Sequence, residues 1–196
     1  MKKMSKVTSI LLVGVGGQGA ILVSKVLTQG LIEAGYDVKM SEVHGMSQRG
    51  GSVSTQVRFG EKVYSPIIGR GEADIMVSFE KMEAVRYADF LKPDATVIVN
   101  DYEIVPMSVA TGELEYPKGL MEELKENYRT LAINAGQIAI EQGNARSMNI
   151  VLFGAMVKAL GMNDIDWEGV LRKVLKPSIL EVNLKAFRAG QAAFEG

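Results

Sequence analysis

Strand patterns and helix patterns alternate along this chain. Runs of apolar and β-branched residues predict strands at residues 8–13, 38–41, 52–59, 73–79, 95–100 and 130–135. Apolar positions at helical spacing predict helices at residues 20–34, 80–91, 120–128, 136–143, 149–160, 164–175 and 180–194. Alternation of this kind is typical of strand–helix–strand units that build a parallel sheet covered by helices. The pattern therefore predicts an α/β fold with a mostly parallel sheet.

Three stretches depart from this rhythm. Residues 52–59 alternate apolar and polar side chains, and residues 62–65 are predicted to pair back as a hairpin partner, which gives an antiparallel excursion at the sheet edge. Residues 102–119 hold two prolines and two glycines, which predicts an irregular connection with a short strand at 113–116. Residues 149–160 are apolar nearly all round, which predicts a buried helix or an interface helix.

The first predicted strand runs directly into a cluster of glycines. The spacing Gly-x-Gly-x-x-Gly permits a tight strand-to-helix turn, the close approach of a ligand or a partner backbone, and close helix packing. The first turn of the next helix carries unpaired N–H groups that can bind an anion. Glycines needed only for packing would explain the same pattern, so both interpretations stay open. The candidate binding residues are Gly14, Gly16, Gly17, Gln18 and Gly19.

A second cluster of glycines and polar residues follows the second strand. In an open α/β sheet it lies at the same edge as the glycine turn, which is where ligands bind. Arg49 would supply charge, and His44 would supply a hydrogen bond or a proton-sensitive contact. The alternative is a surface loop whose glycines only turn the chain. The candidate binding residues are His44, Ser47, Gln48, Arg49, Gly50 and Gly51.

The amino-acid composition limits the kinds of ligand and reaction that these clusters can support. The 196 residues include 22 Lys and Arg against 23 Asp and Glu, so no basic field points to nucleic acid. The chain has no cysteine and a single histidine, which argues against thiolate or histidine metal sites, iron–sulfur ligation and a cysteine nucleophile. We assign no catalytic residue and no metal ligand, because His44 has no partner carboxylate that the sequence identifies.

The amino terminus is basic, but the apolar run that follows it is short and ends in glycines. It lacks a small-residue cleavage site, so we expect neither a signal peptide nor a membrane span. The expected location is the cytoplasm.

The two glycine clusters together resemble the gamma-type subunit of 2-oxoacid:ferredoxin oxidoreductases. The resemblance rests on residues 14–19, 42–51 and 53–59, and it covers nearly the whole chain in length and order. It implies one domain over residues 1–196, with a Rossmann-like three-layer α/β/α fold and carboxy-terminal helices. The combination of the two motifs is far more specific than either motif alone.

The resemblance also implies a division of labour. A large cysteine-rich subunit would hold thiamine diphosphate and 4Fe-4S clusters, and this chain would hold no cofactor of its own. The complex would decarboxylate indolepyruvate or another aryl 2-oxoacid, reduce ferredoxin and release the acyl group to coenzyme A. The glycine turn and residues 47–51 would face the large subunit or the diphosphate of coenzyme A.

Two other functions remain open from the residues themselves. A stand-alone nicotinamide- or flavin-dependent oxidoreductase would use the glycine turn, with Glu42 as acceptor for a ribose hydroxyl. A nucleotide-binding module without enzymatic activity would use the same turn. The isolated chain could also form a homodimer through residues 149–160 or through the carboxy-terminal helices.

Overall fold

A six-stranded sheet forms the centre of the molecule. The computed structural model describes residues 6–44 and 51–195, and the sheet order is β2-β3-β1-β4-β5-β6. Five strands share one direction, and β3 runs against them. The strands are β1 (Thr8–Val15), β2 (Asp37–His44), β3 (Ser52–Gly60), β4 (Ala73–Ser78), β5 (Leu91–Asn100) and β6 (Arg129–Ile133).

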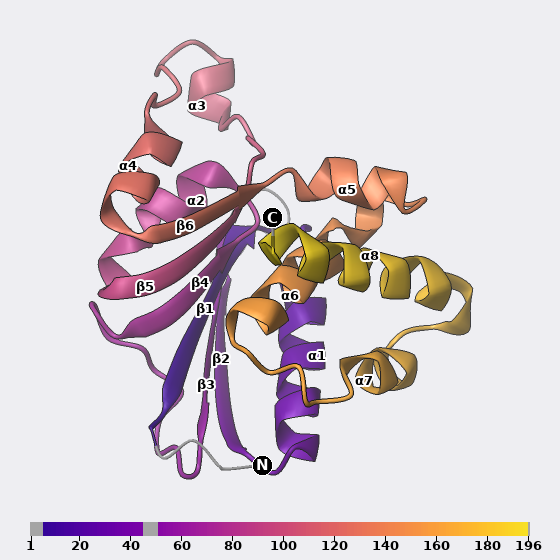
Figure 1. Cartoon of the computed structure of the whole chain (residues 1–196). Coiled ribbons are helices and arrows are strands. Elements are labelled where there is room, and N and C mark those ends of the chain that lie inside the picture. The colour runs from indigo at the N-terminus through magenta and orange to yellow at the C-terminus, as the bar shows by residue number, and fades with distance from the viewer. Residues whose placement is uncertain (1–5, 45–50, 196) are drawn as a thin grey trace.

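Helices cover both faces of the sheet, which confirms the predicted three layers (Figure 1). One face carries α1 (Ala20–Glu33), α5 (Ala135–Glu141), α6 (Met148–Ala159), α7 (Trp167–Val174) and α8 (Pro177–Glu195). The other face carries α2 (Lys81–Arg86) and α4 (Leu120–Asn127). Short segments complete the chain: η1 (Ala88–Phe90), α3 (Met107–Ala110) and η2 (Ala145–Ser147).

Strand β1 is buried along all of its eight residues, because it lies inside the sheet and is covered on both faces. Its side chains alternate between the two cores, with Ile10 and Leu12 on the α1 side and Leu11 and Val13 on the α2 side. Since burial on both faces needs a continuous apolar run, the sequence pattern at this strand is explained.

The antiparallel excursion differs from its prediction in two ways. Strand β3 lies between β1 and β2 rather than at the sheet edge, and its hairpin partner is the preceding strand, with His44 opposite Val53. Residues 62–65 form no strand. The segment after β3 instead crosses the polar face of the strand, where Gln56 accepts a hydrogen bond from Ile68 N–H at 2.7 Å and Arg58 donates to the Ile67 carbonyl at 2.8 Å.

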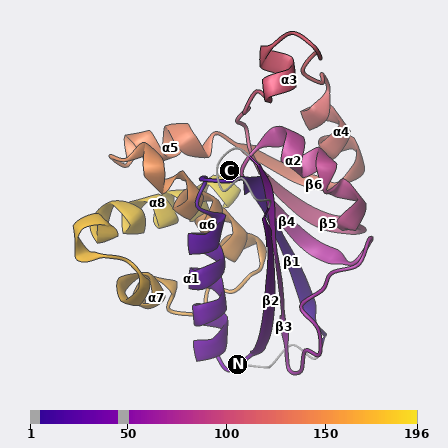
Figure 2. The ribbon, with the colours of Figure 1, turned by 180° about the vertical axis from the view of Figure 1, so that it is seen from behind.

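Two other elements are shorter or different from the expected ones. The predicted helix at 80–91 is α2 followed by η1, because Leu91 already begins β5. The predicted strand at 113–116 is absent from the described residues, and α3 forms a single helical turn within the irregular connection. Residues 101–119 leave the sheet edge as a protruding arm in both views (Figures 1 and 2).

Helix α6 is buried within the chain itself. Residues 149–157 are all buried, between the sheet and α8. This decides between the two predictions for this helix, since a face already covered by α8 is not available to a second copy. Among the helices of residues 6–44 and 51–195, none has the length and apolar character needed to cross a membrane.

Candidate functional site

A cleft opens where β1 ends and α1 begins. Its volume is about 360 Å³, and its walls come from the glycine turn, the first turn of α1 and the facing ends of β2 and β3. The lining residues are Val15, Gly16, Gly17, Gln18, Gly19, Ala20, Ile21, Glu42, Val43, Val53, Ser54 and Thr55. The glycine turn predicted from the sequence therefore forms one wall of a real concavity.

Backbone conformation explains two of the turn's glycines. Gly17 and Gly19 have φ angles of +102° and +88°, a region that side chains strongly disfavour. A Cβ atom at Gly17 would meet no atom within 4 Å, whereas one at Gly19 would overlap the amide of Asn149 on α6. Gly19 therefore allows α6 to approach, and Gly17 leaves open space toward the cleft.

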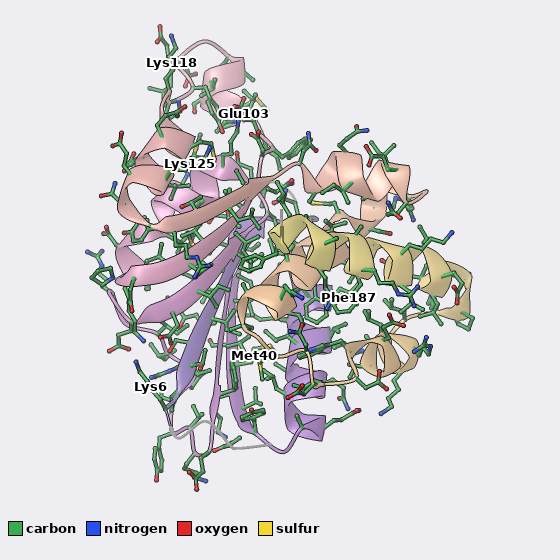
Figure 3. The ribbon with its side chains drawn as sticks, viewed as in Figure 1. Lys6, Met40, Glu103, Lys118, Lys125 and Phe187 are labelled. Atoms are coloured by element: carbon green, nitrogen blue, oxygen red, sulfur yellow. The ribbon has the colours of Figure 1, made fainter. Side chains whose placement is uncertain are left out.

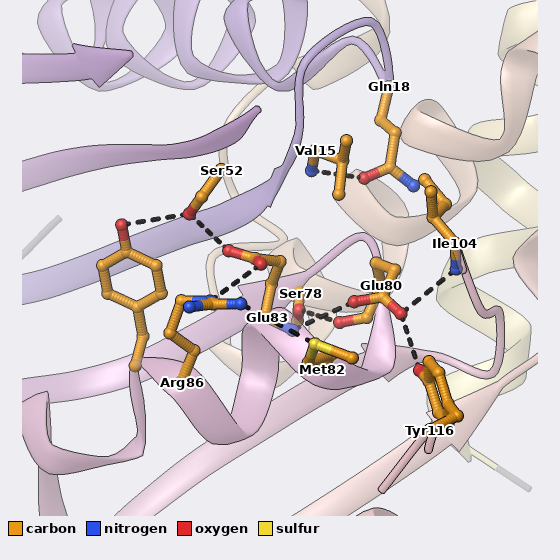
Figure 4. A network of polar contacts seen from close by, with 11 residues as sticks. Val15, Gln18, Ser52, Ser78, Glu80, Met82, Glu83, Arg86, Ile104 and Tyr116 are labelled. Carbon is orange, nitrogen blue, oxygen red and sulfur yellow. Dashed lines mark hydrogen bonds and ion pairs between the residues drawn. The ribbon is translucent and has the colours of Figure 1, made fainter. Parts of the chain in front are cut away.

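Gln18 has a structural role in this turn. Its side-chain oxygen accepts a hydrogen bond from Val15 N–H at 2.7 Å (Figure 4), and its amide nitrogen donates to the Phe79 carbonyl at 2.8 Å. Asn100 donates to the same carbonyl at 3.2 Å. These bonds fasten the turn to the end of β4, so the Gln18 amide holds the wall of the cleft in place.

The cleft has two polar ends of opposite character. At one end, no side chain caps the first turn of α1, which leaves backbone N–H groups suited to an anion. On the opposite wall, the exposed Glu42 carboxylate accepts a hydrogen bond from Ser24 at 3.0 Å. The apolar side chains of Ile21 and Val43 line the same cleft. This arrangement suits an anionic group at the helix and a hydroxyl or amine near Glu42.

The two sequence clusters meet through the backbone. Gly16 N–H donates to the Gly51 carbonyl at 2.8 Å, so the end of the second cluster lies against the glycine turn. Ser47, Gln48, Arg49 and Gly50 lie outside the described residues, as does the side chain of His44, although the backbone of His44 ends β2. The structure thus brings Gly51 to the glycine turn, although Gly51 is not among the residues that line the cleft.

A buried acidic network supports the site from the other face of the sheet. Ser52, the residue after Gly51, donates to the Glu83 carboxylate, and Arg86 donates to the same carboxylate at 3.0 Å (Figure 4). Glu83 is buried on α2, and Ser52 also lies 3.4 Å from the Tyr87 hydroxyl. The start of β3 is therefore fixed to α2.

Glu80 forms a second buried contact, at the base of the 101–119 arm. Only 1% of Glu80 is exposed. Its carboxylate accepts hydrogen bonds from Glu83 N–H at 3.0 Å, Ile104 N–H at 3.3 Å and the Tyr116 hydroxyl at 3.0 Å. Burial, followed by the nearby Glu80 charge, raises the pKa of Tyr116 above its ordinary value. The hydroxyl therefore stays protonated and keeps donating to Glu80.

These supporting residues were not predicted from the sequence. Asn149 donates to the Gly19 carbonyl at 3.3 Å from 130 positions away, and no local pattern identifies such a pair. Asn100 and Glu80 each stand at or just after the carboxyl end of a strand, which is where α/β sheets place functional side chains. Their position at the carboxyl end of a strand was the sequence feature that could have identified Asn100 and Glu80 as candidates.

The described residues offer no metal-binding group. No cluster of three or more His, Cys, Asp or Glu side chains lies together within residues 6–44 and 51–195. The full sequence has no cysteine for an iron–sulfur cluster. The donor set of this chain therefore does not fit such a cluster.

Comparison with known proteins gives the family. The indolepyruvate oxidoreductase subunit IorB of Pyrococcus horikoshii is 40% identical over 193 residues, which cover 94% of this chain and 95% of that protein. The subunit of the same name from Archaeoglobus fulgidus is 39% identical, over 93% of this chain and 92% of its own. The fold resembles the crystal structure of the keto/oxoacid ferredoxin oxidoreductase gamma subunit from Geobacter sulfurreducens PCA. That likeness has a TM-score of 0.71 at 24% identity and covers 96% of this chain and 98% of the other.

Residues 9–193 match the family described as pyruvate ferredoxin/flavodoxin oxidoreductase. The match spans both glycine clusters, all of the sheet except the first residue of β1, and all but the end of the last helix. This chain belongs to the pyruvate ferredoxin/flavodoxin oxidoreductase family.

Proposed function

We propose that this chain is the small, non-autonomous subunit of a 2-oxoacid:ferredoxin oxidoreductase that acts on indolepyruvate or other aryl 2-oxoacids. The observation that carries the proposal is the similarity to IorB subunits at 37–40% identity over nearly the full length. The complex decarboxylates the 2-oxoacid oxidatively, passes the electrons to ferredoxin and forms the acyl-coenzyme A product. Residues 1–196 act as one gamma-type domain in the cytoplasm.

The chemistry of the chain supports this division of labour. Without cysteine, it supplies no thiolate ligands for a 4Fe-4S cluster, and its described residues gather no metal-binding group. A larger, cysteine-rich partner therefore holds the clusters and thiamine diphosphate. The similarity to subunits of oxidoreductases favours this function over a stand-alone nicotinamide or flavin enzyme.

The cleft is the part of this chain that we propose to face the active-site region. The uncapped turn of α1 and the open space at Gly17 suit the diphosphate of coenzyme A, and Arg49 adds positive charge. Glu42 does not suit an anion, so a hydroxyl or amine of the same molecule belongs beside it. A backbone segment of the larger subunit is the other occupant that these features favour.

The test is an affinity pull-down of the tagged chain from an extract of its source cells, followed by viologen-linked oxidation of 2-oxoacids on the retained material. We expect a large cysteine-rich subunit and an activity that requires coenzyme A and prefers aryl 2-oxoacids. A chain that elutes alone and binds a dinucleotide would overturn the proposal. The chain purified alone is the control, and we expect it to be inactive.

A further inference from the structure

The 101–119 arm has a length and shape that the sheet does not require. It connects β5 to α4 through 19 residues whose regular structure is one helical turn, α3. Connections of this length without their own packed structure are uncommon in compact domains and are usually functional. None of the four α3 residues is buried, and the arm protrudes beyond the layers of the fold (Figures 1 and 2).

The arm is nevertheless held firmly at its base. Both of its ends meet the start of α2, where Glu80 accepts hydrogen bonds from Ile104 N–H on the outgoing segment and from the Tyr116 hydroxyl on the returning segment. Lys81 donates to Asp101 at 3.0 Å and to Glu103 at 2.6 Å. Within the arm, the N–H groups of Glu113 and Leu114 both donate to the Ser108 carbonyl. The arm is therefore an ordered projection that is fixed at its base and exposed at its tip.

Apolar side chains are exposed along this projection. Tyr102, Val105, Met107 and Leu114 are each between 52% and 78% exposed. Exposed apolar side chains gathered on one feature mark an interaction surface, and tyrosine and methionine are enriched at the centre of protein interfaces.

The charge of the same region identifies the kind of partner. Residues 101–127, which comprise the arm and α4, hold seven acidic residues against two lysines, a net charge of −5 in a chain whose total is −1. Asp101 and Glu103 are paired with Lys81, while Glu113, Glu115, Glu122, Glu123 and Glu126 make no ion pair within the described part of the chain. Glu103 and Lys118 lie on the projecting side (Figure 3).

We propose that the 101–119 arm and the acidic face of α4 dock onto the larger subunit, which presents an apolar groove with a basic rim. The inference rests on the proposed function, since it takes that subunit as the occupant. A symmetric contact with a second copy would bring together two surfaces that each carry a net charge of −5. Like charges facing each other across an interface oppose association. A partner of opposite charge is attracted by the same surface.

The test uses the full chain and the larger subunit recovered and purified as described above. In one variant, Met107→Ser with Leu114→Ser removes the apolar tip, and we expect at least a tenfold weaker equilibrium affinity. In a second, Glu113→Lys with Glu115→Lys reverses charge, and we expect slower association at low salt, with the difference from wild type shrinking at high salt. Circular dichroism checks that each variant is folded.

Matched controls come from the opposite end of the sheet and from elsewhere on the surface. Ile32→Ser with Tyr64→Ser removes two exposed apolar residues near the amino ends of the strands. Glu61→Lys with Asp164→Lys makes the same charge change at two other exposed acidic residues. We expect both controls to bind as wild type does.

Three outcomes would overturn the inference. Arm variants that bind as tightly and as fast as their controls would overturn it alone and leave the proposed function standing. A wild-type dimer that the arm substitutions dissociate, measured by sedimentation, would assign the arm to a second copy instead. A wild-type chain that binds no larger subunit would overturn both the inference and the proposed function.

Discussion

At the scale of single residues, the glycine turn contains two positions with the same backbone conformation and different surroundings. At Gly19, an alanine would adopt a positive φ and would also overlap Asn149. At Gly17, an alanine would adopt a positive φ but would overlap no neighbouring atom. A left-handed conformation costs a residue with a Cβ roughly 1–2 kcal/mol. We expect Gly17→Ala to lower the free energy of unfolding by about that amount and Gly19→Ala by about 3 kcal/mol, since overpacking adds to it. Urea denaturation of the two variants measures the difference, and equal losses would contradict the packing role of Gly19.

Tyr116 gives a prediction with a defined pH dependence. Tyr116→Phe removes one of the three donors to the buried Glu80 carboxylate, and a hydrogen bond to a charged group contributes about 1.5–3 kcal/mol. Because the folded-state pKa of Tyr116 is raised, wild-type stability from this group is complete below pH 10. It declines as the pH rises above 10, where the tyrosine of the unfolded chain ionises first.

The stability difference between wild type and Tyr116→Phe should therefore narrow as the pH rises above 10. Chemical denaturation at a series of pH values measures this difference. The control is Tyr64→Phe, because Tyr64 is 89% exposed and its substitution should leave stability unchanged. A difference that stays constant through this alkaline range would argue against the raised pKa.

At the scale of elements, α6 and α8 pack through two glycines. A Cβ atom at Gly154 would overlap the Phe187 carbonyl oxygen and lie 3.0 Å from Gln191 N, and one at Gly190 would overlap the Val151 carbonyl. These obstacles are backbone atoms, so the helices must move apart to accept a methyl group. We expect Gly154→Ala to lower the free energy of unfolding by about 3 kcal/mol, the upper end of overpacking costs.

The matched control for this pair is Gly136→Ala in α5. The nearest atom to a Cβ there is Asn134 Oδ1 at 3.6 Å, and alanine has a better helix propensity than glycine by about 1 kcal/mol. Gly136→Ala should therefore be neutral or stabilising in thermal unfolding. If Gly154→Ala behaves in the same way, the close approach of α6 and α8 is not required for stability.

Local sequence patterns predicted the strands and helices better than they predicted which elements contact each other. Strands β1 and β4, and β5 from Ala95 on, are largely buried on both faces, and their apolar runs identify them from the sequence. The partner of β3 was predicted wrongly, because residues 62–65 carry a plausible strand pattern and only the sheet order decides which neighbour pairs. The contact between Asn149 and Gly19, and the approach of Gly154 to α8, depend on tertiary packing that no periodicity encodes.

At the scale of the whole molecule, the glycine turn and the 101–119 arm both stand at the end of the sheet where the parallel strands terminate. The turn follows β1, and the arm follows β5. Their chemistry differs, since the turn offers uncapped N–H groups and the arm offers acidic and apolar side chains. A single partner that covers this end could thus contact the arm while the cleft remains the place for a smaller anionic molecule.

Arg49 provides the test of that arrangement in the reconstituted complex. If Arg49 supplies charge to the diphosphate of coenzyme A, Arg49→Ala should raise the KM for coenzyme A about tenfold or more, since a hydrogen bond to a charged group contributes roughly 1.5–3 kcal/mol. The KM for the 2-oxoacid and the affinity for the larger subunit should stay unchanged. Arg70→Ala is the control, because Arg70 is exposed and precedes β4 at the other end of the sheet. An unchanged KM for coenzyme A would remove Arg49 from this role, whereas weaker subunit binding would assign residues 47–51 to the contact with the partner.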